Sequence, residues 1–370
     1  MIKQTNSGEV KYIDEYRDKD LIIKLSNLIK KAAIHCYAFM EVCGGHTSAI
    51  NRFGIPSLLP VNIKLISGPG CPVCVTDTSF IDKAIALSNR EDIIIATFGD
   101  LIRVPGSASS LEKEKMAGHD IRIVLSGLEA LDIAKANSEK KIVYLGIGFE
   151  TTAPGNAVTI KEAHKAGIGN FFLLSAHKLM PPAMEIIIKE GINLNGFICP
   201  GHVAAITGSK AFRFIPEQYK IGCVITGFEP VDILQAIYML VKQVNRRTAE
   251  MEIQYRRAVT EAGNHIALQA MNEVFEPCDE HWRGLGLIPS SGLKLRKKFK
   301  KYDAGKLMQF SFKEKPENKL CICGEILKGM KTPTDCSLFA RLCVPENPVG
   351  ACMVSAEGAC NAFYKYRING

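Results

Sequence analysis

The chain has 370 residues, of which 47% are hydrophobic and 23% charged, and its formal net charge is +8. This length predicts two or three domains, and the composition is that of a globular protein without low-complexity tracts. No run of about 18 apolar residues is present. The charged start MIKQTNSGEVKYIDEYRDKD lacks the apolar core of a signal peptide, so we expect a cytoplasmic protein that does not bind a membrane.

One pattern recurs between residues 35 and 235: a short apolar run rich in β-branched residues, then a loop of Gly, Pro, His or Cys, then a helix-like segment. Examples are YAFMEVCGGHT, IKLISGPGCPVC and KIVYLGIGFETTAPG. Strands that alternate with helices predict parallel sheets whose strands are buried on both faces. The polar loops all follow strands, and in open α/β sheets this is the edge where ligands bind.

Two Rossmann-like α/β units that face a cleft are therefore expected, the first in residues 1–125 and the second in residues 126–245. The stretch 230–259 is predicted to be helical, because apolar residues fall on one face. These residues are Ile233, Ile237, Leu240, Val241 and Val244. Residues 246–370 are expected to form a helical linker and a small C-terminal domain rich in Pro, Gly, Lys and Cys. Since this domain has little apolar content, we expect a metal cluster to stabilise it.

The stretch CGGHT (residues 43–47) places Cys43 at the end of a predicted strand, with two glycines and His46 behind it. A soft thiolate and an imidazole this close together suit a transition metal or an activated thiol. A buried structural cysteine is the alternative interpretation. His177 and His202 also follow predicted strands, and each is interpreted as a hydrogen-bonded structural histidine.

The stretch GPGCPVC (residues 68–74) holds two cysteines that are separated by two residues. A CxxC pair can close a small disulfide ring or supply two of the four ligands of a metal ion. Pro72 stiffens the ring, and the flanking glycines are interpreted as turn residues. No second CxxC pair lies nearby in the sequence, so a redox role for Cys71 and Cys74 is favoured over a zinc site.

Thirteen cysteines is a high number for a reducing compartment, where thiols more often serve metal or redox chemistry than structural disulfides. Six of them fall in the last fifty residues: Cys321, Cys323, Cys336, Cys343, Cys352 and Cys360. Four thiolates on loops are what an iron–sulfur cluster or a tetrahedral zinc ion needs. The spacing is neither that of a zinc ribbon nor that of a bacterial ferredoxin. The tail is therefore predicted to bind a metal of some kind, and a set of buried free thiols is the alternative.

The basic stretch KLRKKFKKYDAGK (residues 294–306) is interpreted as a solvated face or as a docking patch for an acidic partner. No aromatic interleaving and no nucleic-acid-binding motif accompany it. A nucleic-acid partner is therefore not expected.

Several of these motifs together resemble the HypD family of hydrogenase-maturation proteins: FMEVCGGHTSAINRFGIPSLLP, GPGCPVCVT, GFETTAPG, PGHVAAITG, GFEPVDIL and the cysteine-rich tail. The resemblance runs from about residue 35 to the C-terminus. It implies a scaffold on which the Fe(CN)2CO group of [NiFe]-hydrogenases is assembled, with a HypC-type small chaperone and a HypE-type cyanide donor as partners. Such a scaffold has redox activity and is not a conventional turnover enzyme.

The resemblance also implies roles for individual residues. Cys43 corresponds to the family's iron-binding cysteine, and His46 completes the CGGHT motif. Cys71 and Cys74 correspond to the redox-active pair. A [4Fe–4S] cluster is implied in the tail, and its implied ligands are Cys336, Cys343, Cys360 and either Cys321 or Cys323. This assignment leaves Cys352 over as the sixth thiol.

A free-standing iron–sulfur thiol-disulfide reductase is the alternative function. In that case the cluster and the CxxC pair reduce a protein disulfide, and no second iron is held. A structural zinc protein is a third interpretation. Iron beyond the cluster, with CN and CO bands in the infrared, separates the scaffold from the reductase.

Overall fold

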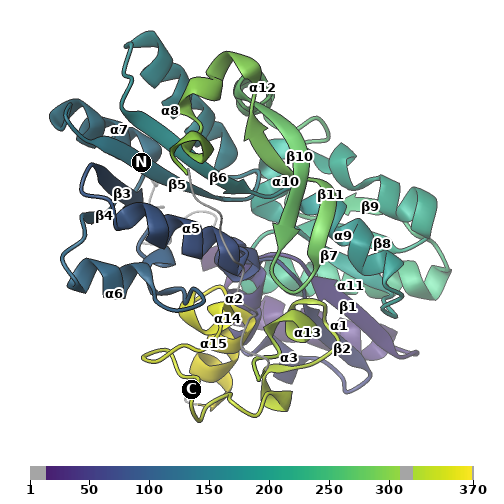
Figure 1. Ribbon diagram of the computed structural model, residues 1–370. Helices are drawn as coiled ribbons and strands as arrows, with labels where there is room; N and C mark the ends of the chain where they lie inside the picture. The colour runs from purple at the N-terminus through teal and green to yellow at the C-terminus, as the bar shows by residue number, and fades with distance from the viewer. Residues whose placement is uncertain (1–13, 309–319, 369–370) are drawn as a thin grey trace.

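The computed structural model describes residues 14–308 and 320–368 (Figure 1). The described part of the chain forms one five-stranded and one four-stranded parallel sheet, flanked by helices, and one two-stranded antiparallel hairpin. The expectation of an α/β protein with two parallel sheets is therefore confirmed. Within the same residues, no helix is long and apolar enough to cross a membrane.

The five-stranded sheet has the strand order β2-β1-β7-β8-β9, and every pair in it is parallel. Its strands are β1 (Tyr37–Glu41), β2 (Ile63–Ser67), β7 (Gly196–Pro200), β8 (Gly222–Thr226) and β9 (Met251–Ile253). β7 and β8 are buried along their whole length, as expected for central strands covered on both faces. The sheet joins two distant parts of the chain, because β1 pairs with β7 from Phe39↔Gly196 onward.

The four-stranded sheet has the strand order β4-β3-β5-β6 and is also parallel. Its strands are β3 (Ile93–Thr97), β4 (Ile121–Ile123), β5 (Lys141–Gly148) and β6 (Phe171–His177). All of them lie between β2 and β7 in the sequence. The sheets therefore do not divide the chain at residue 125, where the first domain boundary is expected, because strand pairing does not follow chain order. The domain boundaries themselves stay a prediction.

Helices of very different length connect the strands. The α-helices are α1 (Lys19–Ala32), α2 (Gly44–Arg52), α3 (Ile55–Leu58), α4 (Pro72–Val75), α5 (Thr78–Ser88), α6 (Leu111–Met116), α7 (Gly127–Ala136), α8 (Ala153–Lys165), α9 (Met180–Lys189), α10 (Gly201–Thr207), α11 (Pro230–Arg246), α12 (His265–Val274), α13 (Cys323–Leu327), α14 (Ala351–Val354) and α15 (Ala359–Phe363). Short 3-10 or π segments are η1 (Asp14–Tyr16), η2 (Leu101–Arg103), η3 (Ser209–Phe212), η4 (Ile215–Tyr219), η5 (Lys297–Tyr302), η6 (Ala304–Leu307), η7 (Pro333–Asp335) and η8 (Tyr364–Ile368).

The helix α11 agrees with the predicted helical spacing over most of its length. It begins with a capping box formed by Glu229 and Asp232, and its apolar stripe packs against β8 and α1. The helix ends at Arg246, whereas the prediction extended it to residue 259. Arg247 takes a left-handed φ of 54°, the conformation that commonly ends a helix, and the following residues form the edge strand β9 instead.

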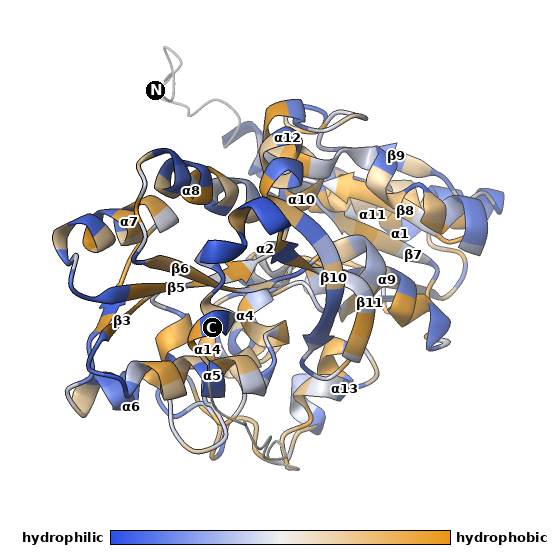
Figure 2. Cartoon of the chain, turned by 45° about the horizontal axis from the view of Figure 1, so that its top comes forward, coloured by the Kyte–Doolittle hydropathy of each residue, from blue (hydrophilic) through white to orange (hydrophobic). Residues whose placement is uncertain are grey.

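The hairpin of β10 (Phe275–Trp282) and β11 (Gly286–Leu295) lies beside α4, because Trp282 makes an isolated antiparallel bridge to Thr76. The tail helices lie nearby, α15 against α2 (Figure 1) and α14 against α4. Hydrophobic residues gather on the strands in the interior of the molecule (Figure 2).

The tail shares this interior. Ile326, Phe339 and Met353 belong to the same apolar cluster as residues of α4 and of both sheets. The sequence argument that the tail has too little apolar content to be stable was therefore incomplete, because the tail packs on the main core. A separate iron–sulfur domain stays a prediction.

Candidate functional site

The loops that follow β1 and β2 meet at the edge of the five-stranded sheet. Cys43 is the N-cap of α2, and Cys71 is the N-cap of α4. The Gly44 N–H donates a hydrogen bond of 2.7 Å to the Gly70 carbonyl. A Cβ atom on Gly70 would overlap the backbone N and Cα of Cys43. The two sequence motifs, CGGHT and GPGCPVC, are therefore in backbone contact.

Cys43 is a buried thiol that the protein holds protonated. Burial raises its pKa to about 12, and the negative charge of Glu357 adds to this effect. The backbone N–H groups of His46 and Gly45 favour the thiolate and so partly offset this rise in pKa. A metal ion that binds here displaces the thiol proton, because metals bind the thiolate.

Glu41 supports the loop of Cys43 from the end of β1. Its carboxylate is buried and accepts hydrogen bonds from the Cys43 N–H, at 3.1 Å, and from the Thr47 hydroxyl. Burial raises the pKa of Glu41 to about 8. The sequence analysis did not single out this residue, although a lone acidic residue inside the apolar run FMEV was a usable signal.

His46 is completely buried and carries one free ring nitrogen. Its Nε2 lies 3.0 Å from the Gly227 carbonyl oxygen, which can only accept, so Nε2 carries the proton. Nδ1 is buried and has no hydrogen-bond partner among the described residues. Burial lowers the pKa of His46 to about 4, so the ring is neutral at pH 7.

Phe228 forms the wall between two histidines. Its ring stacks on His46 at a centroid distance of 4.6 Å and on His202 at 3.9 Å. A Cβ atom on Gly45 would lie 3.0 Å from this ring and 3.7 Å from the Cys43 sulfur, so ring and sulfur are near neighbours. The site thus includes the loop after β8, which the sequence analysis did not connect with CGGHT. His177, by contrast, is hydrogen-bonded at both nitrogens, as predicted for a structural histidine.

Cys71 and Cys74 form a disulfide whose Cα atoms lie 5.2 Å apart. Both cysteines are buried, with 3% and 0% of their surface exposed. The Cys74 sulfur lies 3.9 Å from the carbonyl oxygen of Ala351, the first residue of α14. The disulfide therefore lies between the loop of Cys43 and the tail.

Five of the six tail cysteines line one cavity: Cys321, Cys323, Cys336, Cys343 and Cys360. Apolar side chains of α13, α14 and the connecting loops complete its wall. The Cys321 and Cys323 sulfurs lie 3.1 Å apart, and Gly350 packs against both. Cys352 does not line the cavity, and its thiol contributes to the raised pKa of Cys323.

Cys321, Cys323, Cys343 and Cys360 have raised thiol pKa values. For Cys321 the hydrogen bond with Cys323 is the main cause and burial the second, whereas for Cys343 and Cys360 burial comes first. Within residues 14–308 and 320–368, no three His, Cys, Asp or Glu side chains are arranged to hold a single metal ion. Thiols spread around a cavity with an apolar wall instead suit a multi-iron cluster, whose iron atoms each take one thiolate. The donor set therefore fits the implied [4Fe–4S] cluster.

Comparison with known proteins identifies the family. The family model HypD, described as the hydrogenase formation hypA family, matches residues 19–367. The chain belongs to the HypD family. It is 46% identical to the hydrogenase maturation factor HypD2 of Bradyrhizobium diazoefficiens over 368 residues, which cover 96% of this chain and 97% of the relative.

Relatives of the HypD family with similar coverage occur in distant organisms. The chain is 46% identical to a putative hydrogenase expression/formation protein of Methanocaldococcus jannaschii over 352 residues, which cover 95% of this chain and 98% of the relative. It is 40% identical to the hydrogenase maturation factor HypD of Escherichia coli, with 97% of this chain and 98% of the relative covered. The resemblance that the motifs suggested is thus confirmed at the level of the family.

Proposed function

We propose that this chain is a hydrogenase maturation factor that holds iron at Cys43 while the Fe(CN)2CO group is assembled, and that the reduced Cys71–Cys74 pair and a cluster bound by the tail cysteines supply electrons. The main support for this proposal is a series of direct contacts from the Cys43 loop through Gly70 and the disulfide to the tail. The loop of Cys43 touches the GPG turn, and the disulfide in turn touches α14 beside the cysteine cavity. The names of the HypD relatives agree with this role.

The iron of the Fe(CN)2CO group is the cargo at the Cys43 site. Cyanide and CO bind low-spin iron firmly, so the protein needs only soft, exchangeable contacts to hold it. Cys43 offers a thiolate and His46 offers a ring nitrogen. Among the described residues no three His, Cys, Asp or Glu side chains are arranged to hold a single metal ion, so further ligands for this iron are proposed to come from a partner. A HypC-type small chaperone is the proposed source, and a HypE-type protein the proposed cyanide donor.

The cysteine cavity is proposed as the site of the [4Fe–4S] cluster. The contact between Cys323 and Cys352 distinguishes Cys323 from the other four lining cysteines. The proposed ligands are therefore Cys321, Cys336, Cys343 and Cys360. A bound cluster supplies one-electron transfer.

Reduction of the Cys71–Cys74 disulfide breaks one sulfur–sulfur bond and consumes two electrons and two protons to give two thiols. The position of Cys74 beside Ala351 gives these electrons a short route from the cavity. The stiff turn at Pro72 keeps both sulfurs within reach of each other in the reduced state. The reduced Cys71–Cys74 pair is therefore proposed to store two electrons beside the iron site, which it releases when the disulfide forms again.

The alternative of a free-standing thiol-disulfide reductase has less support. A reductase must expose an attacking sulfur to the disulfide of its substrate. Cys71 is 3% exposed and Cys74 is fully buried. A buried pair suits electron supply to a site inside the protein better than exchange with a second protein.

The proposal is tested by infrared spectroscopy of the chain, purified without oxygen together with its HypC-type partner. The wild type is expected to show CN and CO bands and the cluster absorption near about 400 nm. Cys43→Ala should lose the infrared bands and keep the cluster absorption. Cys36→Ala, which changes an exposed cysteine shortly before β1, is the matched control and should keep both. Bands that persist in Cys43→Ala would show that the iron is held elsewhere.

A further inference from the structure

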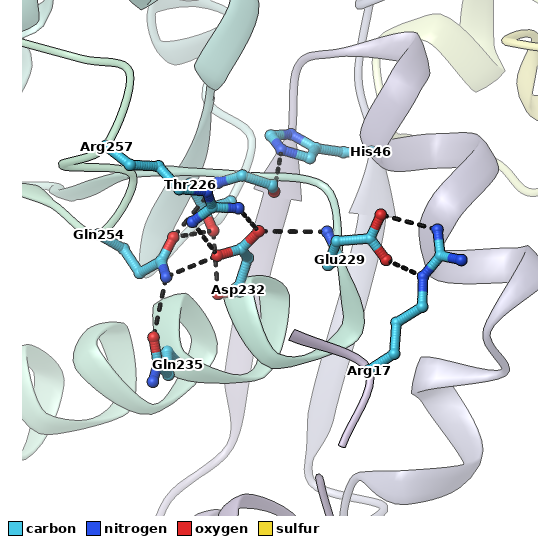
Figure 3. Close-up of polar contacts among 9 residues, drawn as sticks. Arg17, His46, Thr226, Glu229, Asp232, Gln235, Gln254 and Arg257 are labelled. Carbon is cyan, nitrogen blue, oxygen red and sulfur yellow. Dashed lines mark hydrogen bonds and ion pairs between the residues drawn. The ribbon is translucent and has the colours of Figure 1, made fainter. Parts of the chain in front are cut away.

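A network of polar side chains around a buried aspartate lies beside the loop that follows β8 (Figure 3). At its centre is Asp232, whose side chain is fully buried. Arg257 donates two hydrogen bonds to the Asp232 carboxylate, at 2.8 and 2.5 Å. This bidentate pair neutralises the buried charge and fixes its orientation.

Gln254 connects Asp232 to the loop. Its amide N–H groups donate to Asp232 Oδ1 at 2.9 Å and to Gln235 Oε1 at 2.8 Å. Both donors are thus used, so the amide oxygen must face the other way. That oxygen accepts the Thr226 hydroxyl at 3.0 Å and the Gly227 N–H at 3.3 Å.

Asp232 holds the same loop at two further points. Its backbone carbonyl shares the single proton of the Thr226 hydroxyl, at 2.9 Å, with Gln254 Oε1, and its Oδ2 accepts the Glu229 N–H at 3.3 Å. A Cβ atom on Gly227 would overlap Oδ2, so the loop lies directly against the carboxylate. Gln254 therefore holds the Thr226–Gly227 peptide and Asp232 holds the Phe228–Glu229 peptide, so the Gly227–Phe228 peptide between them is fixed at both ends.

The Gly227–Phe228 peptide faces His46. Its carbonyl oxygen accepts the proton of His46 Nε2 at 3.0 Å (Figure 3). In a neutral histidine the hydrogen bond of one nitrogen decides which nitrogen carries the lone pair. Because the carbonyl engages Nε2–H, the lone pair is on Nδ1, which has no hydrogen-bond partner among the described residues.

We infer that Gln254 and Asp232 are positioning residues of the Cys43 site, which hold His46 through the Gly227 carbonyl in the tautomer that offers Nδ1 as the ligand nitrogen. The use of Nδ1 toward iron rests on the proposed function. The tautomer itself does not, because it follows from the fold of this chain alone.

The test is a long-range proton–nitrogen correlation spectrum of the full-length protein, labelled with 15N-histidine, at pH 7. The chain has eight histidines, and the signal that is missing from the spectrum of His46→Gln is assigned to His46. The wild type is expected to show a protonated Nε2 and an unprotonated Nδ1. A wild-type signal with the proton on Nδ1 would overturn the inference.

Gln254→Leu removes the acceptor of the Gly227 N–H and should lower the ratio of Nε2–H to Nδ1–H tautomer about tenfold, which corresponds to the loss of about one hydrogen bond. Gln235→Leu is the matched control, because Gln235 touches Gln254 but has no hydrogen bond to the loop among the described residues. It should leave the ratio unchanged. If Gln254→Leu does not fold, the isosteric Asp232→Asn provides the same comparison.

A folded Gln254→Leu or Asp232→Asn protein with the wild-type tautomer ratio would refute the positioning role. No iron is needed for this measurement. Its failure is therefore distinct from a failure of the proposed function, which the infrared bands of the Cys43 variants report.

Discussion

Gly70→Ala is the most direct test of the contact between the two cysteine loops. The new methyl group would overlap the backbone N and Cα of Cys43 and the carbonyl carbon of Val42. These are backbone atoms at the end of a central strand and cannot rotate aside as a side chain does. The two loops must therefore separate, and the hydrogen bond from the Gly44 N–H to the Gly70 carbonyl is lost or weakened.

The magnitude follows from two contributions. Overpacking of a rigid site costs about 1–3 kcal/mol. The lost hydrogen bond adds about 1 kcal/mol. Gly70→Ala should thus lower the free energy of unfolding by about 2–4 kcal/mol, a substantial part of the stability of a typical protein.

The assay is the shift of the urea unfolding midpoint, followed by the fluorescence of Trp282. Gly155→Ala is the matched control, because Gly155 lies in α8 and a Cβ atom there would meet nothing within 4 Å. This control should raise the stability by about 0.5–1 kcal/mol, since alanine restricts the unfolded chain more than glycine does. Equal midpoints for Gly70→Ala and the wild type would refute the close contact of the loops.

Three further predictions concern charges and thiols. Between pH 7 and pH 4 the wild type should lose about 3 kcal/mol more unfolding free energy than His46→Gln. The reason is that burial lowers the pKa of His46 to about 4, whereas an unfolded histidine titrates at about pH 6.5. Below about pH 6.5 the unfolded chain therefore binds a proton that the folded chain does not bind, and the free energy of unfolding falls as the pH falls. An equal loss of unfolding free energy in the wild type and in His46→Gln would contradict this prediction. Across a series of thiol buffers of different reduction potential, Cys71 and Cys74 should become accessible to alkylation together, at one potential. Alkylation of the two cysteines independently of each other would contradict a shared two-electron couple. Cys336→Ala should lose the iron–thiolate absorption near about 400 nm while Cys352→Ala keeps it, and equal loss in both variants would refute the ligand set.

The alternation of apolar strands with helical segments was sufficient to predict the α/β class and the edge at which Cys43 and Cys71 lie. Both properties are local, because they depend on residues within one strand and the loop behind it. The composition of the sheets was not predictable in this way. The pairing of β1 with β7 depends on packing between segments about 150 residues apart, and the sequence carries no local signal for it.

The candidate site shows the same division. The residues of CGGHT and GPGCPVC were identified from the sequence. Their contact with Gly227 and Phe228 of GFEPVDIL was not, since these residues come from a loop about 180 residues farther along the chain. The reason for Gly70 also differs from the one expected. Neither Gly68 nor Gly70 has a positive φ; Gly70 is required because the backbone of Cys43 lies against it.

The interleaved order of the two sheets has a consequence for synthesis of the chain. β1 and β2 leave the ribosome first, but their sheet cannot grow until β7 and β8 follow. At about 5–20 residues per second, roughly 10–40 s pass between β1 and β8. In that interval the four strands of the second sheet are all synthesised, whereas His46 still lacks the Gly227 carbonyl and the Phe228 ring. A nascent chain therefore exposes the cysteine of CGGHT without its histidine in place, and the site closes only late in translation.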